Sequence, residues 1–136
     1  MNIVAAFLAN RIELTESGFR LDGAFPEYWS IPEIPHTVEL PIGFVASLEP
    51  EEVDETFLVE IQSGSAKAGG VVASGEFMFQ RPPFTKFVDN TPLYVHAAVA
   101  QKVVFTDVGA HATAIFRDGE CLAAIPFGVA LTPQGR

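Results

Sequence analysis

The feature that most constrains this chain is its repeated alternation of apolar and polar residues, interrupted at fairly regular intervals by glycine and proline. Runs rich in Val, Ile, Phe and Thr show this period of two, and no segment shows a sustained helical spacing of apolar residues between caps. Period-two runs separated by turn residues are typical of strands in an antiparallel sandwich. The pattern predicts strands over 3–9, 11–14, 19–23, 37–46, 56–62, 71–80, 93–104, 110–117 and 120–131.

The fold class expected from these runs is all-β. We predict an antiparallel β-sandwich of the immunoglobulin-like or C2-like kind, with about 8–9 strands in a single domain over residues 1–136. A chain of 136 residues suits one domain, and 49% hydrophobic residues are enough for a substantial core.

The stretch "IELTESGFRL" predicts a first hairpin. Its register pairs Leu14 with Phe19, Ile12 with Leu21 and Glu13 with Arg20. The first two pairs are apolar and share one face, whereas the third joins opposite charges on the other face. Because one register satisfies both faces, the sequence defines this hairpin well.

A second hairpin is predicted at Asp118-Gly119, since this dipeptide suits a two-residue type I′ turn. The simplest register pairs Arg117 with Glu120, Phe116 with Cys121, Ala114 with Ala123, Ala112 with Ile125 and Ala110 with Phe127. The last four pairs are assigned to the core side, which makes Cys121 a small core residue. The other face, with His111, Thr113 and Ile115, is expected to be partly covered too. Pro126 has no amide hydrogen, so its strand is expected to be at an edge or bulged there.

Charge and cysteine usage narrow the setting of the protein. The net charge of −9 argues against binding nucleic acid or an anionic membrane, because both need a positive field. The single cysteine allows no disulfide within the chain, no stretch approaches the roughly 18 apolar residues of a membrane span, and the apolar N-terminus has no basic segment before it. These observations favour a soluble, cytoplasmic protein.

Motifs that carry chemistry are not apparent. The sequence has no nucleophile elbow, phosphate-binding loop, zinc-protease helix or paired-cysteine motif. Three histidines, His36, His96 and His111, suffice in number for a zinc set, but nothing in their spacing requires it. The acidic "EPEEVDE" at 49–55 predicts a solvated loop or a short helical turn more than a calcium site, and "SGSAKAGG" at 63–70 predicts a loop. We therefore assign no catalytic residue, no metal and no cofactor.

The stretch "AFPEYWSIPEIPH", residues 24–36, is the best place to look for a binding site. Its prolines favour an extended crossover between sheets. The candidate ligand-binding residues are Glu27, Tyr28, Trp29 and His36. Trp29 has two open roles, as a lid on the core or as an exposed platform, and the first is favoured. A second proline-rich, aromatic connection, "RPPFTKFVDNTP" at 81–92, is expected to pack over an edge of the sandwich.

Both ends of the chain resemble a family of small uncharacterised bacterial β-sandwich proteins. The resemblance rests on "AAFLANRIELTESGFRLDGAF" and "GAHATAIFRDGECLAAIPFGV", which cover roughly the first 45 and last 30 residues by eye. His111 and Thr113 stand where that family usually has large apolar residues. The resemblance implies the fold and no activity or site.

Three functions remain open. The first is a non-enzymatic interaction module that binds a protein partner or a second copy of the chain, because apolar residues on both faces of the last hairpin need a cover. The second is a small-ligand or carbohydrate-binding module that uses Tyr28 and Trp29, and the third is a metal-dependent enzyme with an unrecognised site. The first is favoured.

Overall fold

The computed structural model describes residues 1–16, 18–49, 56–66, 70–80 and 93–133. These residues form nine strands and no helix, and so no helix of the described residues is long and apolar enough to cross a membrane. The strands are β1 (Asn2–Thr15), β2 (Gly18–Ala24), β3 (Tyr28–Ile31), β4 (His36–Leu48), β5 (Thr56–Ser65), β6 (Gly70–Gln80), β7 (Leu93–Phe105), β8 (Gly109–Arg117) and β9 (Glu120–Leu131).

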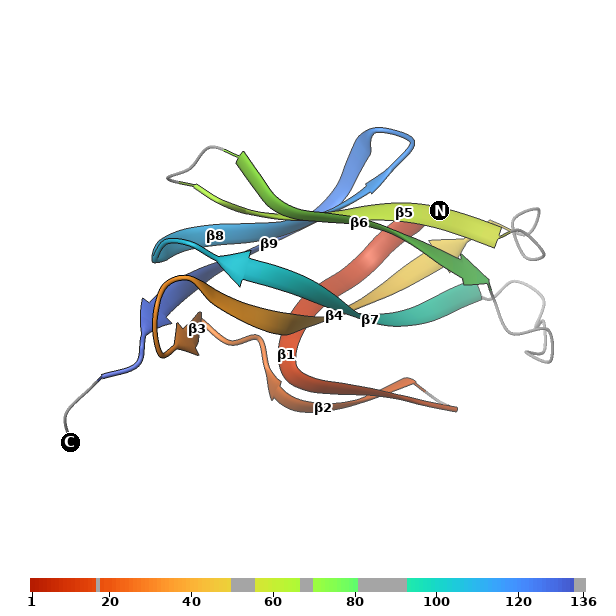
Figure 1. Cartoon of the computed structure of the whole chain (residues 1–136). Coiled ribbons are helices and arrows are strands. Elements are labelled where there is room, and N and C mark those ends of the chain that lie inside the picture. The colour runs from red at the N-terminus through yellow and green to blue at the C-terminus, as the bar shows by residue number, and fades with distance from the viewer. Residues whose placement is uncertain (17, 50–55, 67–69, 81–92, 134–136) are drawn as a thin grey trace.

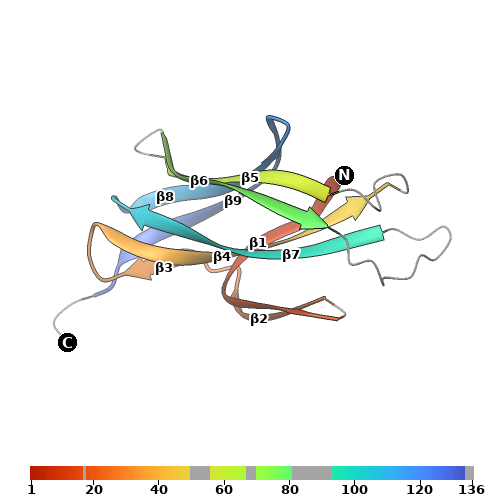
Figure 2. The same ribbon diagram turned by 45° about the vertical axis from the view of Figure 1, so that its right-hand side comes forward.

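The strands form two sheets that face one another, as Figures 1 and 2 show. One sheet has the order β2-β1-β4-β7, and the other has the order β3-β9-β8-β5-β6. Every pairing is antiparallel except that of β3 with β9, which is parallel. The all-β class, the two-sheet architecture and the number of strands are therefore confirmed.

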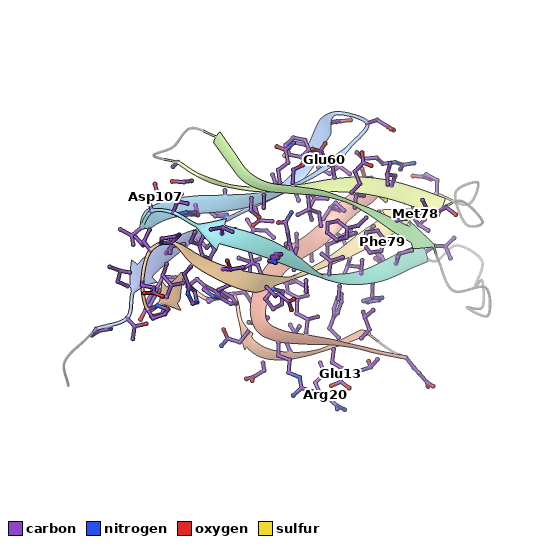
Figure 3. The ribbon with its side chains drawn as sticks, in the orientation of Figure 1. Glu13, Arg20, Glu60, Met78, Phe79 and Asp107 are labelled. Atoms are coloured by element: carbon purple, nitrogen blue, oxygen red, sulfur yellow. The ribbon has the colours of Figure 1, made fainter. Side chains whose placement is uncertain are left out.

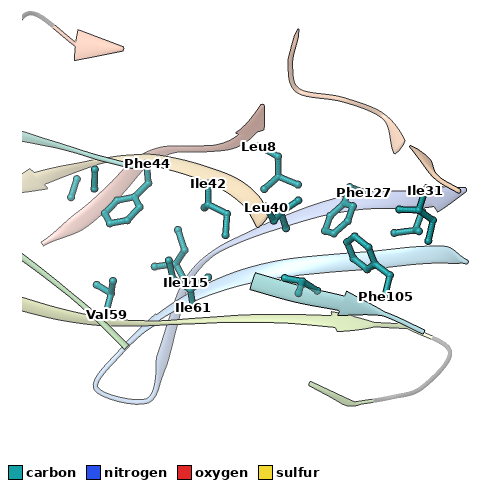
Figure 4. Close-up of a cluster of buried hydrophobic side chains, with 14 residues drawn as sticks. Leu8, Ile31, Leu40, Ile42, Phe44, Val59, Ile61, Phe105, Ile115 and Phe127 are labelled. Atoms are coloured by element: carbon teal, nitrogen blue, oxygen red, sulfur yellow. The ribbon is translucent and has the colours of Figure 1, made fainter. Parts of the chain in front are cut away.

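A large cluster of apolar side chains lies between the sheets (Figure 4), and a smaller one of Leu48, Phe57, Leu93 and Val95 lies beside it. The members of the large cluster include Leu8, Ile31, Leu40, Ile42, Phe44, Val59, Ile61, Phe105, Ile115 and Phe127. The predicted alternation holds along β5, where Val59 and Ile61 are buried, whereas Thr56 and Leu58 are exposed. Period-two patterning thus places one face of each strand in the core.

The first hairpin has the predicted register. Leu14 lies opposite Phe19, Ile12 opposite Leu21 and Glu13 opposite Arg20. Figure 3 shows the last pair on the side of the hairpin that faces away from the sheets, with 3.8 Å between the charged groups. The strands predicted over 3–9 and 11–14 are one strand, β1, which pairs with β4 through its first half and with β2 through its second.

This hairpin belongs to the four-stranded sheet through β1, but it bends over the outer face of β4 and β7 and lies below them in Figures 1 and 2. The Phe19 ring lies edge-on to the rings of Phe7 and His96, with 5.1 Å between centroids in each case. Phe7 is almost fully buried although it points away from the main core. The hairpin therefore adds a partial third layer, which the sequence did not suggest.

The second hairpin turns at Asp118-Gly119 as predicted, and Arg117 with Glu120 and Phe116 with Cys121 are paired. Beyond these pairs the predicted register is wrong by one residue. Ile115 lies opposite Ala123, Ala114 opposite Ala124, Ala112 opposite Pro126 and Ala110 opposite Gly128. Leu122 is the extra residue of a bulge, which lets two residues of one strand oppose one of the other.

The bulge reverses the predicted facing of β8. His111, Thr113 and Ile115 are buried, whereas Ala110 and Ala112 are on the outside. Cys121 is also exposed, and the prediction of a small core residue there is wrong. A shift of one residue exchanges the two faces of a strand, so the outer face of β8 and β9 becomes the alanine-rich one.

Two connections differ from expectation. Strand β3 (Tyr28–Ile31) lies within the proline-rich stretch for which an extended crossover was predicted and no strand was assigned. Strand β5 continues through Ser65, so the predicted loop at 63–70 is shorter than expected. The acidic run 50–55, residues 67–69 and the connection at 81–92 lie outside the described residues.

Candidate functional site

Residues 25–27 cross from the four-stranded to the five-stranded sheet and are held at both ends by backbone hydrogen bonds. The Phe25 amide donates to the Leu8 carbonyl of β1 at 2.9 Å, and the Gly128 amide of β9 donates to the Glu27 carbonyl at 2.9 Å. A Cβ on Gly128 would lie 3.3 Å from that of Tyr28, so the small residue there lets β3 lie close to β9.

A hollow of about 370 Å³ opens beside this crossover, between β1 and β9. It is lined by Ala6, Leu8, Phe25, Pro26, Glu27, Ala124, Ile125 and Pro126. We call it the crossover groove. Seven of these eight residues are apolar, and Glu27 supplies the one charge. Ligand sites in proteins usually have apolar walls with few polar groups, and their cavity volumes are roughly 300–1,000 Å³.

The four predicted site residues are separated by the structure. Glu27 lines the crossover groove, and Tyr28 next to it is 59% exposed. Trp29 is half-buried and packs against the main core cluster, in keeping with its role as a lid. His36 is half-buried at the start of β4, opposite Phe105, and is not among the residues that line the groove.

Phe25 is the residue that sequence reasoning missed. Its side chain is 69% exposed at the rim of the groove, with the centroid of its ring 5.7 Å from that of Phe7. Its backbone is left-handed, with φ of 55°, a conformation that is strained for a bulky residue. The sequence signal was the Gly23-Ala24-Phe25-Pro26 turn, in which a glycine would have been expected at the strained position.

Ser65 and His111, which are buried, and Asp107, which is partly buried, form a cluster with the residue types of a hydrolase triad but in a different spatial order. The Ser65 hydroxyl donates to Asp107 Oδ2 at 2.7 Å, while His111 Nε2 lies 3.3 Å from Asp107 Oδ1. His111 Nδ1 lies 3.1 Å from the Gly109 carbonyl. In a triad the imidazole stands between the hydroxyl and the carboxylate. Here the carboxylate stands between them, so the imidazole is not placed to take the hydroxyl proton.

The other polar clusters fit structural roles. Ser63 of β5 donates to Gln101 Oε1 of β7 at 2.6 Å and lies 2.9 Å from the Thr113 hydroxyl, and Gln101 Nε2 donates to the Ile61 carbonyl at 2.7 Å. Buried polar groups joined in this way fix how the two sheets face one another. Among the residues that the structure describes, no three His, Cys, Asp or Glu side chains are grouped to hold a metal ion.

Comparison of the sequence with models of protein families and with curated proteins gives no match.

Proposed function

We propose that the protein is a non-enzymatic interaction module that binds a protein partner through the crossover groove. The observation that carries this proposal is Phe25, a large aromatic ring that is 69% exposed and held on left-handed backbone at the rim of an apolar groove. Exposure and backbone strain both lower the stability of the free protein. A partner that covers the ring would account for both.

The other functions have less support. A carbohydrate site would need exposed rings, and of the two candidates Tyr28 is exposed but Trp29 packs on the core. Self-association remains a second use of the same module, since the outer face of β8 and β9 carries Ala110, Ala112 and Ala124 in exposed positions. A metal-dependent enzyme finds no supporting cluster in the described part of the chain.

The setting is part of the same proposal. We place the protein in the family of small bacterial sandwich proteins that it resembles, with an immunoglobulin-like or C2-like arrangement. The two facing sheets, which are antiparallel except for the β3–β9 pair, support this placement. Its one cysteine, Cys121, is a free and exposed thiol, which suits a reducing cytoplasm.

The test is selection of peptides from a displayed random library on the wild-type protein, followed by calorimetry with synthetic copies. Phe25→Gly removes the ring and relieves the left-handed backbone, so the variant should be at least as stable as the wild type. We expect it to bind the selected peptides at least tenfold more weakly. Loss of binding without loss of stability separates function from folding.

The matched control is Met78→Ser, because Met78 of β6 is as exposed as Phe25, at 69%, and does not line the groove. Binding to this variant should equal binding to the wild type. The proposal fails when no peptide is enriched, or when the selected peptides bind Phe25→Gly as tightly as the wild type.

A further inference from the structure

One of the two edges of strand β9 is paired along only part of its length. On one side β9 pairs with β8 from Glu120 to Val129, whereas on the other side β3 pairs only with Gly128–Leu131. Within the described residues no strand is hydrogen-bonded to the second edge of β9 from Glu120 to Phe127, although β1 runs near it. That edge borders the crossover groove through Ala124, Ile125 and Pro126. A strand edge without a paired neighbour is a template for another strand.

The backbone groups that point into the groove follow from the hydrogen bonds beside it. The Gly128 and Thr132 amides donate to carbonyls of Glu27 and Ile31, on the side of β9 away from β8. Strand residues two apart direct their backbone groups to the same side. The amide and carbonyl of Ala124 and the carbonyl of Pro126 therefore point toward the groove.

Strand β8 gives an independent check of this assignment. Ala110, which lies opposite Gly128, accepts a hydrogen bond at its carbonyl from the Ala66 amide rather than from β9. Ala110 and Gly128 thus form a non-hydrogen-bonded pair, in which the backbone groups of the two residues point away from each other. Pro126 belongs to the same series, and its missing amide hydrogen falls on the free edge, where the pairing with β8 does not need it.

The opposite wall of the groove is also a strand edge. The Leu8 carbonyl of β1 accepts from the Phe25 amide, on the side of β1 away from β4. Ala6, two residues earlier, directs its amide and carbonyl to that same side and lines the groove. The small side chains of Ala6 and Ala124 keep both edges accessible.

We propose that the protein partner enters the crossover groove as an extended apolar segment that pairs with the free edge of β9, in line with β3. This binding mode rests on the proposed function. We expect the partner segment to carry a basic residue that lies opposite Glu27, which is the one charged residue of the described groove lining. A net charge of −9 disfavours a second copy of this acidic chain and favours a basic partner.

The test uses a peptide selected on the wild-type protein and the variant Ala124→Pro. This change removes the amide hydrogen that faces the groove and leaves the bonds to β8 intact, as Pro126 does already. We expect about two- to tenfold weaker binding, because the loss of one backbone hydrogen bond lowers the affinity by about that factor. The matched comparison is Ala124→Ser, which also enlarges the side chain but keeps the amide, so it should weaken binding less than Ala124→Pro does.

Two measurements on the wild-type protein keep the test valid if Ala124→Pro folds poorly. Bound peptide should slow hydrogen exchange of the Ala124 amide, and N-methylation along the peptide should weaken binding at every second residue, as strand pairing requires. A peptide that needs Phe25 but leaves Ala124 exchange unchanged would overturn strand addition and leave the binding function standing. Absence of any peptide that needs Phe25 would overturn both. The protein could instead dimerise, and Ala124→Pro could abolish the dimer while Ala124→Ser keeps it. That result would identify a second copy as the occupant and overturn the choice of a basic partner.

Discussion

Glu60 lies on the outer face of β5, where two neutral side chains donate hydrogen bonds to one oxygen of its carboxylate (Figure 3). Gln62 Nε2 is 2.7 Å and Ser74 Oγ 2.9 Å from Glu60 Oε1. These bonds, first that from Gln62 and then that from Ser74, lower the pKa of Glu60, and slight desolvation acts the other way. Because the folded pKa is below the unfolded one, the stabilisation is complete above the unfolded pKa and is lost as pH falls through the folded pKa.

We therefore expect Ser74→Ala to raise the pKa of Glu60 toward its ordinary value, because one of the two bonds to the ionised form is lost. Titration of the Glu60 carboxyl by NMR measures the change directly. Ser30→Ala, which removes an exposed hydroxyl on β3 that lies 2.8 Å from the Thr132 hydroxyl, should leave the Glu60 titration unchanged. An equal pKa in Ser74→Ala and the wild type would show that the serine does not hold the carboxylate in solution.

At the scale of elements, the attachment of the first hairpin depends on Gly43 of β4. The Phe7 ring lies over this glycine, and a Cβ there would be 2.5 Å from Phe7 Cζ. The ring is confined by Phe19 and Phe25, with centroid separations of 5.1 and 5.7 Å. A methyl group at position 43 must therefore displace Phe7 and, with it, the hairpin.

Gly43→Ala is expected to lower the free energy of unfolding by about 1–3 kcal/mol, the usual effect of overpacking, although alanine otherwise suits a strand no worse than glycine. Urea denaturation gives the value. In a double-mutant cycle with Phe7→Leu, whose shorter side chain frees the space, part of the loss should be recovered. Strictly additive losses would mean that the ring is not the obstacle.

Turn residues and strand faces explain how much of these elements was predictable. The Glu13–Arg20 and Arg117–Glu120 pairs come next to tight turns, and both were predicted correctly because a turn fixes the register beside it. The bulge at Leu122 was not predictable, since the residues Cys121 to Ile125 are small or apolar on both faces. With no polar residue to mark the outside, the sequence favours neither register.

The site was predictable only in part, for a related reason. The proline-rich stretch drew attention to Glu27, which lines the crossover groove, and to Tyr28 beside it. Its prolines argued against a strand, so the four-residue strand β3 between Pro26 and Pro32 was not predicted. The groove itself depends on β1 and β9, which are more than 100 residues apart in the sequence and come together only in the folded sandwich. Local patterns carry no information about such a pairing of distant edges.

At the scale of the whole molecule, charge sets which partners can approach. The chain carries 17 acidic and 8 basic residues, so a basic segment is attracted over distances well beyond contact. Such long-range attraction is screened by salt within about 10 Å at 0.1 M. A charge that contacts the ligand is screened less, and among the residues that the structure describes Glu27 is the only charged one that lines the crossover groove. The two contributions are therefore separable by mutation and ionic strength.

We expect peptides selected on the groove to contain Lys or Arg among apolar residues, and to bind more weakly, through a slower association rate, as salt is raised. Glu27→Gln should weaken binding at every salt concentration, mainly through faster dissociation, because it removes the contact at the groove. Glu33→Gln, an exposed carboxylate outside the groove lining, changes the net charge equally and should affect only the association rate. Rates measured by surface plasmon resonance separate these effects. Equal rate changes in the two variants would mean that net charge alone attracts the partner and that Glu27 makes no contact with it.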